Sequence, residues 1–282
     1  MFRRKKLFPI LIIFILGILL ISNKILQLKK SSLDISNKML VHFIDVDQGD
    51  SILVQVNNKN LLIDSGPSYA KENLFNYLRS INIKTFDYII ATHPHEDHIG
   101  NMSSIINNYK VLNFYSPKAT SNTKAFETMV ESLSRKNLKI NVIKANINSI
   151  DLGKNTKVEF FSPNNSTYEN TNNYSPIFKI TYGKTSFLFT GDAEELIESE
   201  VINNNYNLKS DLLKVGHHGS STSTSKRFFQ KVNPKISIIS VGENNIYNHP
   251  KEDVLSTINT SKILRTDLEG TILITSDGLS LK

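Results

Sequence analysis

Cysteine is absent from the 282 residues of this sequence. Without it the protein has no disulfide framework, no thiolate zinc site, no iron–sulfur cluster and no cysteine nucleophile. The absence is compatible with an exported protein, although it does not by itself establish export. Hydrophobic residues make up 39% and charged residues 21% of the chain. This composition predicts a folded domain with a sizeable core and excludes global disorder.

Acidic residues are absent from the first 30 positions, which hold seven of the 33 Lys and Arg residues. The other 26 basic side chains match the 26 Asp and Glu residues of the remaining sequence, so that part carries no net charge. The sequence pI of 9.3 therefore reflects the N-terminal segment. A domain-wide basic field for nucleic acid is excluded, whereas a local basic patch stays open.

The N-terminal segment joins a basic cluster to an apolar run. Arg3–Lys6 precede an unbroken apolar stretch at Leu11–Ile21, and residues up to Leu28 extend it to about 20 residues, enough to span a bilayer. We interpret residues 1–28 as a cytoplasmic basic flank and one transmembrane helix. A cleaved signal peptide is the alternative, but the small-residue cleavage site that it needs is missing. The positive-inside rule then places the rest of the chain outside the cytoplasm, held at the cell membrane or, after cleavage, secreted.

The remaining sequence divides into a polar linker at 29–38 and one domain at 39–282, with no repeat and no break long enough for a second domain. Short β-rich segments alternate there with amphipathic helical stretches. Strands are expected at residues 41–46, 51–56, 60–63, 86–91, 177–182, 185–190, 212–215, 236–241, 263–266 and 271–275. Helices are expected near 73–80, 194–203, 223–232 and 251–258.

The clearest chemical signal is Thr92–His98, in which His93, His95, Asp97 and His98 form a His-x-His-x-Asp-His pattern. The segment follows a predicted strand, so the alternate residues His93 and His95 would point to one side of the loop. Asp97 and His98 would then open a helix and turn back toward the same point. Neutral imidazoles and a carboxylate are suitable ligands for zinc, iron or manganese. The pattern therefore predicts a metal site.

Further segments follow in a set order along the chain: Asp45–Ser51, Leu62–Gly66, Phe189–Glu194, Lys214–Ser220, Asn248–Pro250 and Arg265–Asp267. Together with Thr92–His98, which we call the metal loop, they resemble the metallo-β-lactamase superfamily. In particular, the sequence is similar to the hydrolase domain of ComEC-type DNA-uptake proteins and to stand-alone relatives of that domain. The resemblance runs from about Val41 to Leu281. It implies an α/β fold, an αββα sandwich with the site at one edge.

The same resemblance implies a ligand set for one or two divalent ions, Zn²⁺ or Mn²⁺. It assigns His93 and His95 to a first ion, and Asp97 and His98 to a second. Asp192, which follows another predicted strand, would bridge the two ions.

One histidine from the pair His217 and His218 would complete the second site. Strand alternation means that both cannot face the same way. We select His217 as the ligand, which leaves His218 to support a ligand or to face the substrate.

Four side chains are expected around these ligands. Asp64 would orient a ligand histidine. Asp45 would either shape the entrance or simply form a turn. His249 either protonates a leaving group or holds a phosphate, or it is an ordinary loop residue. Ser220, before a predicted helix, would offer a hydroxyl group to an anion. Asp97, His218 and His249 are the side chains expected to take part in the reaction.

The sequence departs from the family pattern at two points that affect the ligand set and the entrance of the site. No histidine lies between His98 and Asp192, where the superfamily has a further ligand. Asn172 or Asn173 could take that place, and an amide oxygen suits Mn²⁺ better than Zn²⁺. The second departure is Asp47, which stands where the pattern has glycine and adds a carboxylate near the entrance.

Hydrolysis is the natural reaction of such a site, because divalent cations activate water and stabilise developing negative charge. We expect an extracytoplasmic phosphodiesterase or nuclease with DNA as a possible substrate and a DNA-uptake channel as a possible partner. The alternatives are hydrolysis of another ester, a lactone or a β-lactam, and a non-catalytic binding module stabilised by metal. The fold alone does not select among them, and the sequence carries no signal for an oligomeric state.

Overall fold

A computed structural model describes residues 37–147 and 149–282 of the chain. The anchor predicted at 1–28 and most of the predicted linker lie outside the described residues. None of the helices within residues 37–147 and 149–282 is long and apolar enough to cross a membrane. Residues 39–282 form one compact unit.

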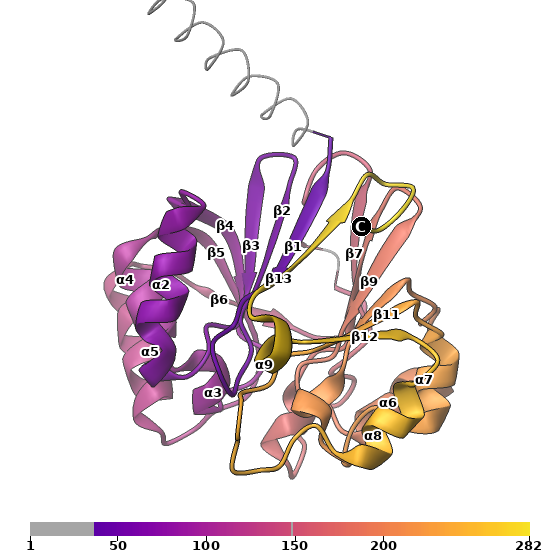
Figure 1. Cartoon of the computed structure of the whole chain (residues 1–282). Coiled ribbons are helices and arrows are strands. Elements are labelled where there is room, and N and C mark those ends of the chain that lie inside the picture. The colour runs from indigo at the N-terminus through magenta and orange to yellow at the C-terminus, as the bar shows by residue number, and fades with distance from the viewer. Residues whose placement is uncertain (1–36, 148) are drawn as a thin grey trace, which may run out of the picture. The chain divides into compact units, whose positions relative to one another are not determined.

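Two β-sheets make up the centre of the domain (Figure 1). The seven strands of the first sheet are, in spatial order, β13 (Ile272–Ser276), β1 (Met39–Phe43), β2 (Ile52–Val56), β3 (Lys59–Ile63), β4 (Thr85–Ile90), β5 (Lys110–Pro117) and β6 (Ile140–Ile143). The six strands of the second are β12 (Lys262–Arg265), β11 (Ile236–Ile239), β10 (Leu212–Lys214), β9 (Thr185–Phe189), β8 (Phe178–Tyr182) and β7 (Thr156–Phe160). The pairs β3–β4, β4–β5 and β5–β6, and the series from β9 to β12, are parallel.

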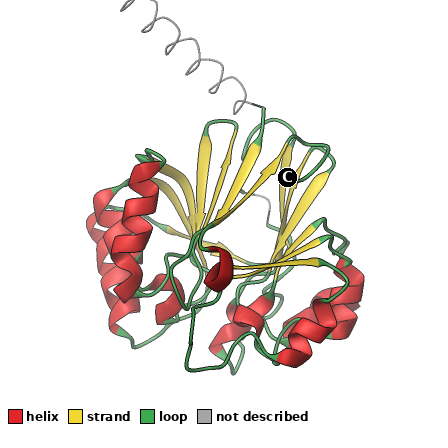
Figure 2. Cartoon of the chain, in the orientation of Figure 1, coloured by secondary structure: helices red, strands yellow, loops and turns green. Residues whose placement is uncertain are grey.

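Helices cover the outer face of each sheet (Figure 2). The first sheet is covered by α2 (Lys71–Ser80), α4 (Met102–Asn108) and α5 (Lys124–Arg135), the second by α6 (Glu195–Asn203), α7 (Lys226–Val232) and α8 (Glu252–Ile258). The short helices are η1 (Ser68–Ala70), α3 (Glu96–Ile99), η2 (Thr171–Tyr174), η3 (Gly216–Gly219) and α9 (Thr266–Glu269). The layers follow the predicted order of helix, sheet, sheet, helix.

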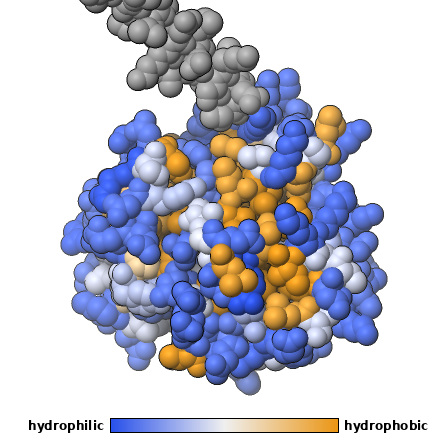
Figure 3. All heavy atoms as spheres, viewed as in Figure 1, coloured by the Kyte–Doolittle hydropathy of each residue, from blue (hydrophilic) through white to orange (hydrophobic). Residues whose placement is uncertain are grey.

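Side-chain alternation along the strands creates the inner core. In β1, Val41 and Phe43 face the second sheet, whereas His42 faces α2 and contacts Tyr77. Because successive side chains in a strand point to opposite faces, each central strand supplies both the inner core and the layer under the helices. The rings of Phe43 and Phe189 stack across the sheets with centroids 6.5 Å apart. On the face shown in Figure 3, polar and charged residues form most of the periphery and apolar residues gather in the middle.

The predicted strands and helices are present, with shifts of a few residues at their ends. The strand expected to reach residue 46 ends at Phe43, because Asp45 accepts a hydrogen bond from the backbone N–H of Asp47 and closes a turn. The helix expected from residue 223 begins at Lys226, where the Ser225 hydroxyl accepts from the N–H of Phe228. β5, β6, β7, α4 and α5 were not expected from the sequence.

Candidate metal centre

Six of the seven histidines of the chain gather at one edge of the two sheets. Their rings form a connected series, in which the centroids of His93 and His98 are 4.1 Å apart and those of His98 and His218 are 5.3 Å apart. His217 and His249 lie at the other end of the series, 5.8 Å from each other. The histidine outside the group is His42, on β1. The histidines are therefore concentrated at the sheet edge where the metal site is predicted.

The centre is built from loops that follow parallel strands of both sheets. β4 leads into His93 and His95, and α3 then carries Asp97 and His98. In the second sheet, β9 leads to Asp192 and β10 leads to η3. Parallel strands bring their carboxyl ends to one edge, so residues far apart in the sequence meet there.

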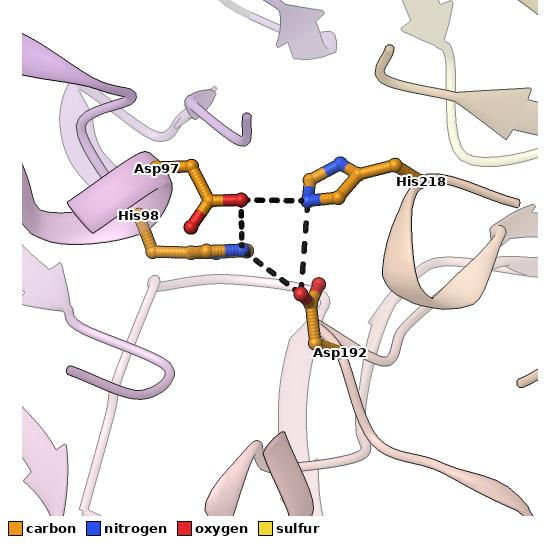
Figure 4. Close-up of side chains that lie close together, drawn as sticks. All are labelled: Asp97, His98, Asp192 and His218. Carbon is orange, nitrogen blue, oxygen red and sulfur yellow. Dashed lines mark ion pairs between the residues drawn. The ribbon is translucent and has the colours of Figure 1, made fainter. Parts of the chain in front are cut away.

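Four side chains converge on a single point (Figure 4). They are Asp97, His98, Asp192 and His218, and one potential ligand atom from each lies within 4.8 Å of all the others. Nε2 of His98 is 3.2 Å from Oδ2 of Asp192. Nε2 of His218 is 3.4 Å from Oδ2 of Asp97 and 3.6 Å from Oδ2 of Asp192. The group joins α3, the loop after β9 and η3.

Hydrogen bonds on the far sides of the two rings fix which nitrogen faces this point. Nδ1 of His218 lies 2.9 Å from the carbonyl oxygen of Ser240, which can only accept, so this nitrogen carries the proton. Nδ1 of His98 lies 2.8 Å from Oδ2 of Asp64. Nε2 of each ring therefore faces the carboxylates, and it can bind a metal ion there once the ion displaces the proton.

Carboxylates set the electrostatic potential of the centre. Burial alone would lower the pKa of His98, but Asp192 and the neighbouring carboxylates raise it well above its usual value. Burial would also lower the pKa of His218, and Asp192 again raises it. Burial would raise the pKa of Asp192, but the charges of His98 and His218 hold it well below its usual value. A site of this potential attracts a cation, and a metal ion competes with protons for the same nitrogen atoms.

His93 and His95 form a second pair of nitrogen donors beside the first group. Nε2 of His93 is 3.0 Å from Nδ1 of His95 and 3.8 Å from Oδ2 of Asp192. The other nitrogen of His93 contacts the hydroxyls of Thr92, at 3.1 Å, and Ser175, at 3.2 Å. Burial, first of all, holds the pKa of His93 well below its usual value, so the ring is neutral and able to bind metal.

His217 and His218 have different surroundings. The structure places His218, rather than the selected His217, in the four-residue group. His218 is 1% exposed, whereas the side chain of His217 is 24% exposed. Nε2 of His217 still lies 3.6 Å from Oδ2 of Asp192, and its Nδ1 contacts Thr222 at 3.1 Å. The two backbones adopt left-handed conformations, with φ of 48° and 53°, so strand alternation does not describe this turn.

The two candidate asparagines lie in η2 and are buried. Both ends of the Asn173 amide contact Glu194. Oδ1 accepts from the backbone N–H of Glu194 at 3.1 Å, and Nδ2 donates to Oε2 of the same residue at 3.3 Å. Nδ2 of Asn172 faces the same carboxylate at 3.5 Å, while its Oδ1 has no hydrogen-bond partner among the described residues. Asn172 therefore keeps an available oxygen, three residues before Ser175, which contacts His93.

The remaining predicted residues surround the centre at different distances. Nδ1 of His249 is buried without a hydrogen-bond partner among residues 37–147 and 149–282, and its ring stacks on Tyr247. Burial, aided by His217, lowers the pKa of His249 to about 4. The hydroxyl of Ser220 is 3.1 Å from that of Thr222. Asp45 accepts from the N–H of Asp47 and donates its own N–H to the hydroxyl of Thr271, so it holds a turn.

An ion pair behind His218 was not anticipated as a functional element. Nζ of Lys214 lies 2.9 Å from Oδ1 of Asp50, and both side chains are buried. The same oxygen is 3.7 Å from Nδ1 of His218. The backbone N–H of Asp50 donates to the carbonyl oxygen of Asp97, at 3.2 Å. The presence of both residues in the family segments was the signal that could have identified them.

An acidic cleft of about 400 Å³ opens beside Asp97. Asp47, Glu96 and Glu243 contribute carboxylates to its lining, and the exposed rings of Tyr69 and Tyr247 contribute aromatic surface. Asp47 has φ of 63°, a conformation that glycine adopts without strain. The carboxylate that departs from the family pattern therefore adds negative charge to the cleft.

The chemistry of these donors fits divalent metal ions. Nε2 of His98, Nε2 of His218 and Oδ1 of Asp192 are buried without a hydrogen-bond partner among the described residues. Buried polar atoms are seldom left unpaired, because losing water without replacement costs about 1–3 kcal/mol for each. Imidazole nitrogen and carboxylate oxygen are the preferred ligands of zinc and related metals. Divalent ions bound at this centre would supply the missing partners of these atoms.

A family model described as the metallo-beta-lactamase superfamily matches residues 44–243. The chain belongs to this superfamily. Within it, the sequence is 34% identical to ComE operon protein 3 of Bacillus subtilis over 258 residues, 84% of this chain and 33% of that protein. It is 27% identical to competence protein ComA of Neisseria gonorrhoeae over 242 residues, 84% of this chain and 32% of that protein. The resemblance to ComEC-type proteins is thus confirmed, and the chain spans about a third of these curated relatives.

The fold is also shared with a solved structure of a metallo-β-lactamase superfamily member. The metallo-beta-lactamase fold protein YhfI of Bacillus subtilis superposes with a TM-score of 0.58 at 14% sequence identity, covering 85% of this chain and 99% of that one. At this identity the likeness establishes the architecture, and the reaction has to be argued from the site.

Proposed function

We propose that this metallo-β-lactamase superfamily member is a metal-dependent phosphodiesterase that acts on nucleic acid. The observation that carries the proposal is the convergence of Asp97, His98, Asp192 and His218 at the open edge of the sheets, with buried atoms of His98, Asp192 and His218 left without a partner among the described residues. The choice of a phosphodiester rests on the relatives, one of which is named as a competence protein. Competence suggests DNA as the substrate class.

Two ions would be held in this arrangement. His93 and His95 would bind the first, with the amide oxygen of Asn172 as a further donor. Asp97, His98 and His218 would bind the second. Asp192 contacts both groups, because its Oδ2 lies 3.8 Å from His93 and 3.2 Å from His98, and would be shared. The choice between zinc and manganese depends on how strongly Asn172 contributes.

Divalent cations supply two things in such a site, an activated water and stabilisation of negative charge on the reacting group. The protein's own residues supply orientation. Asp64 and the Ser240 carbonyl hold the rings of His98 and His218, and Thr92 and Ser175 hold the ring of His93. The rings of His249 and His217 lie 5.8 Å apart beside these ligands, and either would be available to protonate a leaving group. Fixed ligands of this kind keep the site organised before the substrate arrives.

The proposed setting is outside the cytoplasm at the cell membrane. It rests on the basic cluster and apolar run of residues 1–28, which would anchor the domain, or release it after cleavage. A DNA-uptake channel would be the natural partner of an enzyme in that position. Purified membranes treated with protease from the outside would test this, since an external domain is digested and a cytoplasmic one is protected.

The acidic cleft favours a second candidate function, hydrolysis of an ester, lactone or β-lactam that carries little negative charge. Asp47, Glu96 and Glu243 would repel a polyanion that entered by that route. Lactones and nitrocefin, assayed beside phosphodiesters with the same protein, separate the two candidates.

The proposal is tested with the 282-residue chain, its metal content measured by elemental analysis. Bis-p-nitrophenyl phosphate and single-stranded DNA are the substrates, with Mn²⁺ or Zn²⁺ added. We expect the protein to hydrolyse these substrates, and we expect Asp97→Ala and His95→Ala each to lower the rate by more than about 100-fold. Loss of a residue that only supports a ligand typically lowers activity by about 10- to 100-fold, so a larger loss indicates a ligand. Glu131→Ala, exposed on α5, is the control. Hydrolysis unchanged in both ligand variants would contradict the proposal. Bound metal without turnover on any substrate would favour a non-catalytic binding module.

A further inference from the structure

A groove with unpaired positive charge lies at the end of the first sheet. It has a volume of about 260 Å³ and is lined by Lys118, Lys144, Asn164, Asn165, Ser166 and Tyr174 together with Val142, Ile143 and Pro163. Two lysines, polar side chains and one aromatic ring therefore share one depression with an apolar floor. No acidic residue is part of this lining.

Strand register places the two lysines side by side. β5 and β6 are parallel, and Pro117 pairs with Ile143 at their carboxyl ends. Lys118 and Lys144 are the next residues of the two strands, so they leave the sheet as neighbours. Adjacent strands are about 4.8 Å apart. Figure 1 shows β4, β5 and β6 in the same sheet, and β4 is the strand that leads to the metal loop.

Neither lysine has a counter-ion in the described part of the chain. Within residues 37–147 and 149–282, both side chains are exposed, and neither ammonium group makes a hydrogen bond or an ion pair. Like charges on neighbouring strands repel each other and destabilise the empty state. An anion between the two ammonium groups would remove this repulsion, so the groove is suited to a phosphate.

The groove adjoins the metal centre through η2. Tyr174 lines the groove, and the next residue, Ser175, has its hydroxyl oxygen 3.2 Å from Nδ1 of His93. β4 and β5 are parallel, with Ile90 paired to Tyr115. Lys118 lies three residues after Tyr115, just as His93 lies three residues after Ile90. A chain of phosphates lying along this edge would pass from the lysines to the metal centre.

We propose that this groove binds a nucleotide of single-stranded nucleic acid next to the bond that is cleaved, with its phosphate between Lys118 and Lys144. The inference rests on the proposed phosphodiesterase function and names its substrate class. Val142, Pro163 and Tyr174 offer apolar and aromatic surface to a base, and the lysines offer charge to the backbone. This combination is typical of sites for single-stranded nucleic acid. The acidic cleft on the Asp97 side would then direct the polyanion toward the groove.

The test compares Lys118→Gln/Lys144→Gln with Lys231→Gln/Lys262→Gln, which removes the same charge from exposed lysines on α7 and β12. Binding of a fluorescent single-stranded DNA to the 282-residue chain is followed by anisotropy in EDTA, so that cleavage cannot interfere. We expect the groove variant to bind about tenfold more weakly at about 0.1 M salt. Its log–log salt dependence should fall by about 1.4, since each lost contact removes about 0.7. The control should resemble the wild type.

Cleavage assays separate this inference from the proposed function. The groove variant should retain wild-type kcat/KM for bis-p-nitrophenyl phosphate, which has no neighbouring nucleotide for the groove to hold, and should have a lower kcat/KM for single-stranded DNA. Weaker DNA binding in a protein that cleaves no phosphodiester would uphold the groove and contradict the enzyme. Active enzyme with equal DNA affinity and salt slope in both double variants would overturn the groove. If the wild type bound inorganic polyphosphate as tightly as single-stranded DNA, and the groove variant bound both more weakly by the same factor, nucleic acid would not be the specific occupant of the groove.

Discussion

Oδ2 of Asp64 lies 2.8 Å from Nδ1 of His98, on the side of the ring that faces away from Asp192. Asp64 is fully buried, and its carboxylate also accepts hydrogen bonds from the backbone N–H and the hydroxyl of Thr92, at 2.8 and 2.7 Å. All its partners belong to the metal loop or its start. Asp64 therefore orients the imidazole and keeps a proton on Nδ1, which leaves Nε2 free for a metal ion.

Asp64→Asn should weaken metal binding by about 10- to 100-fold, the usual cost of losing such a partner. The asparagine amide would donate to Nδ1, and the proton of His98 would then lie on the nitrogen that faces the metal. Competition with a fluorescent chelator measures the affinity. Ser65→Ala, which removes a hydroxyl that bonds the His98 carbonyl oxygen, is the neighbouring control. Equal affinities in wild type and Asp64→Asn would show that Asp64 has no orienting role.

His218→Ala and His217→Ala should have different effects on metal content. Nε2 of His218 is buried and unpartnered within the four-residue group, so its loss should remove the second ion. His217 is partly exposed and hydrogen-bonded to Thr222, so its variant should keep the metal and lose turnover. Elemental analysis and steady-state kinetics on the same preparations give both values. The reverse pattern would make His217 the ligand.

Asn172→Ala should lower occupancy of the first site, while Asn173→Ala should leave the metal content of folded protein unchanged. Only the amide oxygen of Asn172 lacks a partner in the described residues, since both amide atoms of Asn173 contact Glu194. The measurement is the number of ions retained after gel filtration, with circular dichroism to verify the fold. Two ions per chain in Asn172→Ala would show that His93 and His95 hold the first ion without this amide.

Much of the architecture followed from sequence periodicity and the family segments. Strands such as β8 and β9 were predictable, because β-rich runs flank the turn at Gly183. β6 was not, since Ile140–Ile143 is short and its first three residues are exposed, which leaves no alternating pattern to read. The sequence of α5 has the length and apolar spacing of a helix. It was missed because β5, the strand that precedes it, was not predicted either.

The candidate site was predictable in its residues and less so in their orientations. His93, His95, Asp97, His98 and Asp192 were identified from the metal loop and the family segments. The choice between His217 and His218 depended on a strand rule that fails where both residues have positive φ. Ser240 could not be predicted, because it acts through its backbone carbonyl. Every residue has this group, so the residue type gives no indication of the role.

His42, the histidine outside the metal centre, is buried between two hydrogen-bond partners. Nδ1 lies 2.8 Å from the Tyr77 hydroxyl and Nε2 lies 3.0 Å from Oε1 of Gln55. A neutral ring satisfies both, because it donates to the amide oxygen and accepts from the phenol. Burial lowers the pKa of His42 from 6.5 to about 4, partly offset by the bond to Gln55.

His42 should therefore make stability depend on pH, and His42→Gln should remove that dependence. The folded pKa lies below the unfolded one, so the contribution is complete above pH 6.5 and is lost as the pH falls toward 4. The loss should reach about 3 kcal/mol, at about 1.4 kcal/mol for each pKa unit. Urea unfolding of metal-free wild type and variant across this range measures it, and subtraction of the two curves cancels the other titrating groups. A difference that stays constant with pH would mean that His42 does not titrate during unfolding.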